Sequence, residues 1–373
     1  MKTMAFALVA MNSTLANAAQ APVPTVIAKQ LQAAISDHKA ATPAIAGEIM
    51  TVWTPKWKWS GAVGKVSGGQ MPLTPQHSFR TASVTKSFTA AAILRLMETG
   101  RLDITKPIND LISKETSALL IAGGYDPVQI TVQQLMSHTS GIYDHAANSK
   151  FTAKVMSDPT YQWTRAEQIK HAVDNGKPVG KPGEFASYSD TGYIILGEII
   201  ERKTGQNLAS AVRSLLRFDK LGLTDTYWEQ LERKPVSSKA PFTGNMFQEL
   251  DLTQANHSFD LFGGGGLIST TQDLNIFFRA LVRGEVFDDR RTLAVLLTVP
   301  VAKQGEGEQN VYGNGVYPIQ FGRQQCFGHG GFWGVATFYC AASDTTVTWT
   351  MNYAGEVSAK VDILKRLATL TGN

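Results

Sequence analysis

Ser83 and Lys86 are the residues of this sequence whose types and spacing first suggest covalent chemistry. They lie in the stretch Thr81–Leu94, whose small and helix-favouring residues predict a helix that ends before Gly100. Side chains three positions apart share one face of a helix, so the lysine amine would lie one turn from the serine hydroxyl. A hydroxyl becomes a nucleophile when a base takes its proton, and a lysine in apolar surroundings can be that base. Taken alone, the pair also fits an ordinary serine near a helix start.

A second stretch, residues 182–193, is predicted to be a loop that leads into a helix, and it carries Tyr188 and Asp190. If Tyr188 is buried beside the lysine, the ammonium is expected to pull the pKa of the phenol down. A phenolate there would accept the Ser83 proton and return it to a leaving group. The alternative is a tyrosine that packs its ring at a helix entrance.

A third stretch, Phe327–Gly334, is predicted to start a strand beside a space lined by glycines. His329 would present a partial or full positive charge to a substrate there. Gly330 and Gly331 would let a substrate lie against the strand, and the N–H of Phe332 would be a donor to an oxyanion. The alternative is a tight turn with a histidine on the surface.

In order and spacing, the three stretches together resemble the motifs of the serine hydrolases of the class C β-lactamase and D-alanyl-D-alanine carboxypeptidase family. That family carries Ser-x-x-Lys, then Tyr-x-Asn, then Lys-Thr-Gly or His-x-Gly. Further stretches that agree with the family are Leu135–Ile142, Pro182–Glu184 and Gly264–Thr270.

The resemblance implies a role for each motif residue. Ser83 is expected to be the nucleophile that forms an acyl-enzyme. Lys86 and Tyr188 are expected to share the proton transfer. The N–H groups of Ser83 and Phe332 would form the oxyanion hole. The remaining residues expected in the site are Asp190 and His329, with Gly330 and Gly331 on the substrate side. The family needs no metal and no cofactor.

Two positions depart from the family pattern. Asp190 stands where the family usually has Asn, and an ionised Asp accepts hydrogen bonds but cannot donate one. Near Lys86 it would favour the ammonium, which makes Tyr188 the better candidate for the base. Gly330 stands where a hydroxyl residue is often found, and His329 is a weaker cation than lysine at neutral pH. Both departures weaken the case for efficient penicillin hydrolysis.

The leading functional prediction is therefore a serine hydrolase that works by acyl transfer. Its substrates are D-amino-acid peptides or amides, simple esters or β-lactams, and the sequence leaves this choice open. One alternative is a carboxylesterase of the same fold. Another is a catalytically weak penicillin-binding or sensor protein, a reading favoured only by Asp190.

The predicted fold is α/β (α+β), with strands at both ends of the chain and helices between them. Expected strands lie at 45–53, 59–66, 310–317, 332–340 and 345–351. By resemblance, the architecture is a β-lactamase-like antiparallel sheet flanked by helices, with an inserted all-helical domain. Residues 24–98 and 258–373 would form the sheet domain and residues 99–257 the helical one, with the active site in the cleft between them.

The composition of the chain limits the classes of partner molecule that we expect. The chain of 373 residues is 43% hydrophobic and 18% charged, with a formal net charge of +4. Its Lys and Arg residues form no basic block, so we expect no nucleic acid, and the partner is a small-molecule or peptide substrate. After the N-terminus there is no apolar run of about 18 residues, so no membrane span is expected. The oligomeric state is not indicated.

The N-terminus predicts export. Residues 1–18 combine a lysine, a short apolar run and a final Ala-x-Ala site, as in a secretory signal peptide cut after Ala18. The protein would then be periplasmic or secreted. In an exported protein the two cysteines, Cys326 and Cys340, can pair, but the sequence leaves open whether they form a bridge or stay as two buried thiols.

Overall fold

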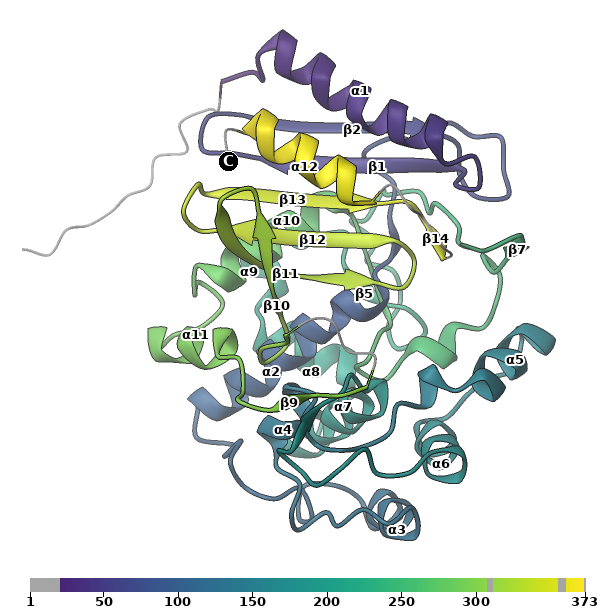
Figure 1. Cartoon of the computed structure of the whole chain (residues 1–373), viewed down its shortest axis with the longest axis vertical. Helices are drawn as coiled ribbons and strands as arrows, with labels where there is room; N and C mark the ends of the chain where they lie inside the picture. Colours follow the sequence, from purple (N-terminus) through teal and green to yellow (C-terminus); the bar gives the residue numbers. More distant parts are fainter. Residues whose placement is uncertain (1–20, 307–310, 355–359, 372–373) are drawn as a thin grey trace, which may run out of the picture.

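The computed structural model describes residues 21–306, 311–354 and 360–371, so the predicted signal peptide lies outside the described residues. A six-stranded antiparallel sheet dominates one side of the molecule, with the strand order β10-β11-β12-β13-β1-β2 (Figure 1). Strands from the two ends of the chain meet where β1 pairs with β13. The strands are β1 (Gly47–Trp53), β2 (Lys58–Gly64), β10 (Tyr317–Phe321), β11 (Gln324–Gly331), β12 (Val335–Cys340) and β13 (Thr345–Thr350).

The two faces of this sheet differ because side chains alternate along each strand. The apolar face, which includes the cross-strand pair Met50 and Trp349, packs against α1 (Thr25–Ala41) and α12 (Lys360–Thr371). The opposite face is rich in threonine and packs against α10 (Thr271–Val282). There the hydroxyls of Thr51 and Thr271 are 2.7 Å apart, so a buried hydrogen bond joins the sheet to this helix.

The second side of the molecule is helical. Helix α2 (Thr85–Glu98) runs through its centre and packs against α7, α8 and α11, with Phe88 stacked on Phe277 of α10 at 3.5 Å between ring centroids. Helices α3 to α6 lie farther from the sheet (Figure 1). The remaining helices are α3 (Lys114–Ala122), α4 (Val132–Met136), α5 (Ser149–Ser157), α6 (Arg165–Asn175), α7 (Asp190–Thr204), α8 (Leu208–Leu215), α9 (Phe218–Leu221) and α11 (Arg290–Leu297).

Short strands and turns connect these layers. One small sheet has the order β3-β8-β5, another β14-β6-β7, and β4 pairs with β9. The short strands are β3 (Phe79–Arg80), β4 (Phe185–Ala186), β5 (Tyr227–Trp228), β6 (Met246–Phe247), β7 (Leu250–Asp251), β8 (Leu267–Ser269), β9 (Lys303–Gln304) and β14 (Tyr353–Ala354). The 3₁₀ turns are η1 (Ala82–Val84), η2 (His145–Ala147) and η3 (His257–Asp260).

Local sequence signals predicted several element ends correctly. Thr164 and Glu167 form the expected capping box of α6, in which each side chain bonds the backbone N–H of the other residue. Gly205 ends α7 in a left-handed conformation with φ of 70°. The strands expected at 45–53 and 345–351 are β1 and β13. The antiparallel sheet flanked by helices is thus confirmed.

One expected strand was wrong, and a second strand and one helix are shorter than expected. The strand expected at 310–317 begins only at Tyr317, because Gly315 turns the chain with φ of 99°. The strand expected at 332–340 begins only at Val335, after a turn at Gly334 with φ of 75°. His329 lies near the end of the preceding strand, β11, and not at the start of a strand. The helix expected at 131–141 stops at Met136, because His138 adopts φ of 57°.

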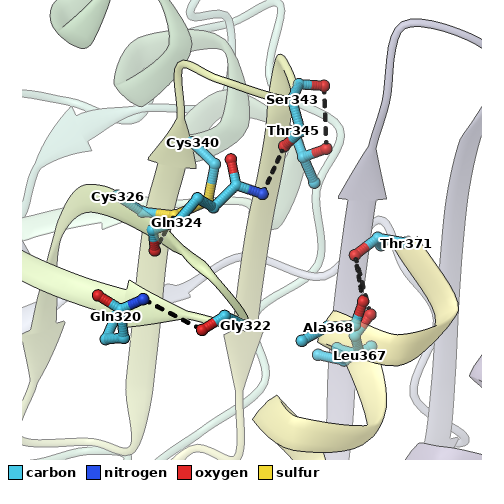
Figure 2. The surroundings of a disulfide bond; sticks show 10 residues. All are labelled: Gln320, Gly322, Gln324, Cys326, Cys340, Ser343, Thr345, Leu367, Ala368 and Thr371. Atoms are coloured by element: carbon cyan, nitrogen blue, oxygen red, sulfur yellow. Dashed lines mark hydrogen bonds between the residues drawn. A yellow bond between two sulfur atoms is a disulfide. The ribbon is translucent and has the colours of Figure 1, made fainter. Parts of the chain in front are cut away.

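Cys326 and Cys340 form a disulfide bond, which decides the alternative that the sequence left open. The cysteines lie on the neighbouring strands β11 and β12, one position beyond the pair formed by Phe327 and Tyr339, and both are fully buried. Figure 2 shows the bond beside Gln324. The disulfide therefore ties the end of this hairpin opposite the turn that follows His329.

Within the part of the chain that the structure covers, no helix is both long enough and apolar enough to cross a membrane.

Candidate active site

Ser83 lies in the 3₁₀ turn η1, immediately before α2. Its neighbour Ala82 adopts φ of 45°, a conformation that residues other than glycine rarely adopt and that often marks functional sites. The turn is tied to β8, because both the N–H and the hydroxyl of Thr81 donate to the carbonyl of Leu267, at 2.9 and 3.0 Å. Between residues 77 and 96 Ser83 alone is not buried. The turn thus holds one serine at an accessible position above a packed helix.

Lys86 lies directly behind Ser83 and is fully buried. Its Nζ donates to Ser83 Oγ at 2.9 Å and to the carbonyl of Gly264 at 2.8 Å, and it forms an ion pair with Asp190. An ammonium has three donors and no acceptor, and these three oxygens match it. The carboxylate of Asp190 compensates the buried charge, as a buried lysine requires.

Tyr188 lies on the other side of Ser83, and its phenol hydrogen-bonds with the Ser83 side chain. The ring centroid is 5.0 Å from Lys86 Nζ. Burial raises the pKa of Tyr188 well above its usual value, the charge of Asp190 raises it further, and the bond to Ser83 lowers it by less. The expectation that the nearby ammonium would pull this pKa down was wrong, because desolvation of the phenolate dominates. Tyr188 is therefore a neutral phenol in this structure.

His329 is also neutral. Its Nδ1 is 2.6 Å from the carbonyl oxygen of Gly330, which can only accept, so Nδ1 carries the proton. Its Nε2 then accepts a hydrogen bond from the Tyr312 hydroxyl at 2.9 Å. Burial lowers the pKa of His329 to about 3, and the charge of Lys86 contributes. The expectation that His329 offers a positive charge to the substrate was therefore wrong.

The residues after His329 face Ser83 through backbone. A Cβ atom on Gly331 would lie 2.3 Å from the carbonyl oxygen of Thr81, so only glycine lets β11 approach the serine turn this closely. A Cβ on Gly330 would meet nothing closer than 3.6 Å. Phe332 lies in the turn between β11 and β12, with a 55% exposed side chain that stacks on Phe247 at 5.7 Å.

A cavity of about 1060 Å³ opens in front of Ser83. The structure brings seven of the eight predicted site residues to its wall, while Lys86 lies beneath it: Ser83, Tyr188, Asp190, His329, Gly330, Gly331 and Phe332. Aromatic and aliphatic side chains form another part of the wall, among them Phe151, Val155, Phe247 and Phe259. The cavity thus joins a nucleophile to a large apolar space.

Sequence reasoning missed three polar residues of this site: Tyr312, Asp144 and Asp260. Oδ1 of Asp144 accepts from the N–H groups of Ala146 and Asp190, at 3.0 and 3.1 Å. Burial, with the charge of Asp190 added, raises the pKa of Asp144 to about 8 and that of Asp260 to about 7. No spacing pattern marks these residues, since they converge only when the chain is folded.

In the described ranges, no three His, Cys, Asp or Glu side chains gather as ligands for a metal ion.

Comparison with proteins of known sequence shows that this chain is similar to protein flp and to a penicillin-binding protein. Protein flp of Staphylococcus aureus (strain NCTC 8325 / PS 47) is 30% identical over 209 residues, which are 55% of this chain and 39% of that protein. Penicillin-binding protein 4 of Amycolatopsis lactamdurans is 30% identical over 168 residues, 44% of this chain and 39% of its own length. The chain thus spans about two fifths of the length of these curated relatives.

Solved structures match almost the whole fold. The D-amino acid amidase from Ochrobactrum anthropi SV3, complexed with D-phenylalanine, superimposes with a TM-score of 0.77 at 23% identity, covering 94% of this chain and 99% of that one. This likeness establishes a shared fold. The family model described as Beta-lactamase matches residues 36–371, a range that contains all the motif residues of the cavity. The solved structures share the predicted β-lactamase-like fold, and the family model matches most of the length of this chain. The chain therefore belongs to the β-lactamase family, a family of serine hydrolases.

Proposed function

We propose that the protein hydrolyses amide or ester bonds through an acyl-enzyme on Ser83. The observation that carries the proposal is the position of Ser83 Oγ at the cavity wall, 2.9 Å from Lys86 Nζ and hydrogen-bonded to Tyr188. Membership of a family of serine hydrolases supports it. The names of the relatives, a penicillin-binding protein and a D-amino acid amidase, favour amides among the possible substrates.

The proton path follows from the contacts of Lys86. As an ammonium it donates to Ser83 Oγ, so it must first pass a proton to Asp190, with which it is ion-paired, before it can accept one. The neutral amine then takes the Ser83 proton while Oγ attacks the carbonyl carbon of the substrate. Since burial keeps Tyr188 protonated, its phenol serves as a donor to the leaving group and not as the first base.

The backbone supplies the remaining parts. In this proposal the N–H groups of Ser83 and Phe332 bind the oxyanion of the tetrahedral intermediate. Gly331 allows the two segments to approach because it has no side chain. His329, held neutral, helps to shape the substrate side of the pocket with Gly330. Water then attacks the acyl-enzyme and gives one proton to the Tyr188 phenolate. The acid leaves as Lys86 returns a proton to the Ser83 oxygen.

We also propose the division into a sheet domain, 24–98 with 258–373, and a helical domain, 99–257, with catalysis in the cleft between them.

Export of the protein stays a proposal as well. It is supported by the disulfide between Cys326 and Cys340, since such bonds persist in oxidising compartments. Cell fractionation and the intact mass of the purified protein test it, because cleavage after Ala18 leaves a defined N-terminus.

Trapping of the acyl-enzyme tests the proposed reaction. The protein is mixed with a short-chain nitrophenyl ester, a D-amino acid amide and a chromogenic cephalosporin, and the intact mass is measured after rapid acid quenching. We expect an acyl adduct on Ser83 with at least one substrate, followed by its loss, and none on Ser83→Ala. An adduct that persists without turnover would support a penicillin-binding or sensor protein. No adduct with any substrate would contradict the proposal.

A further inference from the structure

We propose that His138 is a positioning residue of the reaction, which holds Tyr188 where its phenol can protonate the leaving group. His138 lies in the stretch Leu135–Ile142, is buried, and is not one of the described residues that line the cavity. It would therefore act through Tyr188 and not on the substrate. This inference rests on the proposed function, because it assigns a residue that supports the leaving-group donor of that reaction.

The backbone of His138 meets the segment that carries Tyr188. His138 follows the end of α4 with φ of 57°, a conformation that is unfavourable for a residue with a side chain. Its carbonyl oxygen accepts the N–H of Ser187 at 2.8 Å, and the carbonyl of Thr139 accepts the N–H of Gly183 at 2.7 Å. The left-handed residue therefore lies where the chain leaves α4 and begins to pair with the segment 183–189.

The side chain of His138 holds the other flank of the tyrosine. Its Nδ1 accepts the N–H of Ser189 at 3.1 Å, and its ring packs on the ring of Tyr188 with 4.2 Å between centroids. Ser187 and Ser189 are the two neighbours of Tyr188 in the chain. One residue thus fixes the backbone on both sides of the tyrosine and also contacts its ring.

The chemistry of the imidazole fits this role. Because a backbone N–H donates to Nδ1, this atom carries no proton, and the proton of the neutral ring is on Nε2. Burial lowers the pKa of His138 well below its usual value, and the charge of Lys86 contributes, so the ring stays neutral. Nε2 is buried without a hydrogen-bond partner among the described residues. An apolar side chain would avoid this unsatisfied N–H, but it could not accept from Ser189.

The position of Tyr188 matters because its phenol has a defined target. It hydrogen-bonds with the Ser83 side chain, and in the proposed reaction it gives its proton to the leaving group. Proton transfer requires hydrogen-bond reach, and a misplacement of about 1 Å can cost about 100-fold in rate. A leaving group that is stable as an anion does not need this proton. We therefore expect loss of His138 to slow the reaction according to the leaving group, which a general loss of stability would not do.

Two esters of one acid test this expectation. The acid is the one whose acyl group forms the adduct on Ser83; its benzyl ester needs a proton for the departing alkoxide, whereas its nitrophenyl ester does not. The measured quantity is kcat/KM, which covers the steps up to acylation and is independent of deacylation. In His138→Ala we expect kcat/KM to fall at least about 30-fold for the benzyl ester and less than about threefold for the nitrophenyl ester.

His138→Asn is the conservative variant, because Asn tolerates positive φ and its side-chain oxygen can accept from Ser189. It should recover part of the loss on the benzyl ester, and it gives the same test if His138→Ala does not fold. The matched control is His77→Asn. His77 is buried outside the cavity lining, and its Nδ1 also accepts a backbone N–H, that of Thr74 at 3.1 Å. We expect this control to keep the wild-type ratio of the two esters.

A double-mutant cycle with Tyr188→Phe completes the test. Without the phenol there is no donor to position, so replacing His138 should lower kcat/KM for the benzyl ester little further. Equal losses for the two esters, no loss in a folded variant, a loss that adds in full to that of Tyr188→Phe, or a wild type that cleaves only the nitrophenyl ester would overturn the inference. Failure of both His138 variants to fold would show a structural role and would overturn it too. The proposed function fails only when no adduct forms on Ser83, so the two failures are distinguishable.

Discussion

The Tyr312 hydroxyl donates to Nε2 of His329, 2.9 Å away, and so holds the histidine in the tautomer that carries its proton on Nδ1. This bond gives the third motif a different character from the Lys-Thr-Gly form, the alternative to His-x-Gly in the family pattern. A lysine would present a cation to the substrate, whereas His329 presents a buried, uncharged ring. The site therefore has its cation, Lys86, behind the nucleophile and none on the substrate side within the described lining.

Tyr312→Phe removes the donor of this bond and leaves the buried Nε2 of His329 unsatisfied. We expect the free energy of unfolding to fall by about 1–3 kcal/mol, the penalty for orphaning a buried polar group. Urea denaturation measures it. In a double-mutant cycle with His329→Leu, the combined loss should be smaller than the sum of the two single losses. Strict additivity would mean that the hydroxyl does not stabilise the histidine.

Asp190 can be replaced in two ways that separate charge from shape. Asp190→Ala leaves the Lys86 ammonium buried without its carboxylate, so we expect a loss of about 3–5 kcal/mol in the free energy of unfolding. Asp190→Asn keeps an oxygen acceptor in the same place and should lose less. Chemical denaturation of both variants gives the comparison, and equal losses would argue against a structural ion pair.

The two glycines after His329 form a natural control pair. Gly331→Ala places a Cβ 2.3 Å from the carbonyl oxygen of Thr81, so we expect a marked loss of thermal stability as β11 moves away from the serine turn. Gly330→Ala meets nothing closer than 3.6 Å and should leave the melting temperature within a few degrees of the wild type. Similar melting temperatures for the two variants would contradict the described contact.

His145 makes stability depend on pH. Burial lowers its pKa from 6.5 to about 4, so between these values the unfolded chain binds a proton that the folded protein does not. The stability contributed by neutral His145 is therefore complete above pH 6.5 and is lost as the pH falls toward 4. Relative to His145→Gln, the wild type should lose about 1.4 kcal/mol per pH unit in this window. Denaturation curves at several pH values measure the difference, and a constant difference would contradict the shift.

The elements that position the site were largely predictable from local sequence. These local signals depend only on residues that are close in sequence. They include helix caps such as Thr164, helix ends such as Gly205, and the period-two pattern of Val347, Trp349 and Met351. The strands near the third motif were misplaced because their limits depend on turns at Gly315 and Gly334, where the chain adopts positive φ. Alternation alone does not reveal where such turns fall.

The site was predictable in its motif residues but not in its charges. Spacing and resemblance selected Ser83, Lys86, Tyr188 and His329, and the structure brings them together. The protonation of Tyr188 and His329 is set by burial and by partners distant in sequence, which no local pattern encodes. Asp260 reaches the cavity only through tertiary packing, so nothing in its own neighbourhood marked it.

The central claim is that Lys86 activates Ser83. The rate at which a small fluorophosphonate modifies the protein, with the adduct mapped by mass spectrometry, tests it most directly. We predict modification of Ser83 in the wild type, none in Ser83→Ala, and a rate reduced by at least about 100-fold in a folded Lys86→Met variant. Modification at another residue, or an unchanged rate in Lys86→Met, would contradict the account.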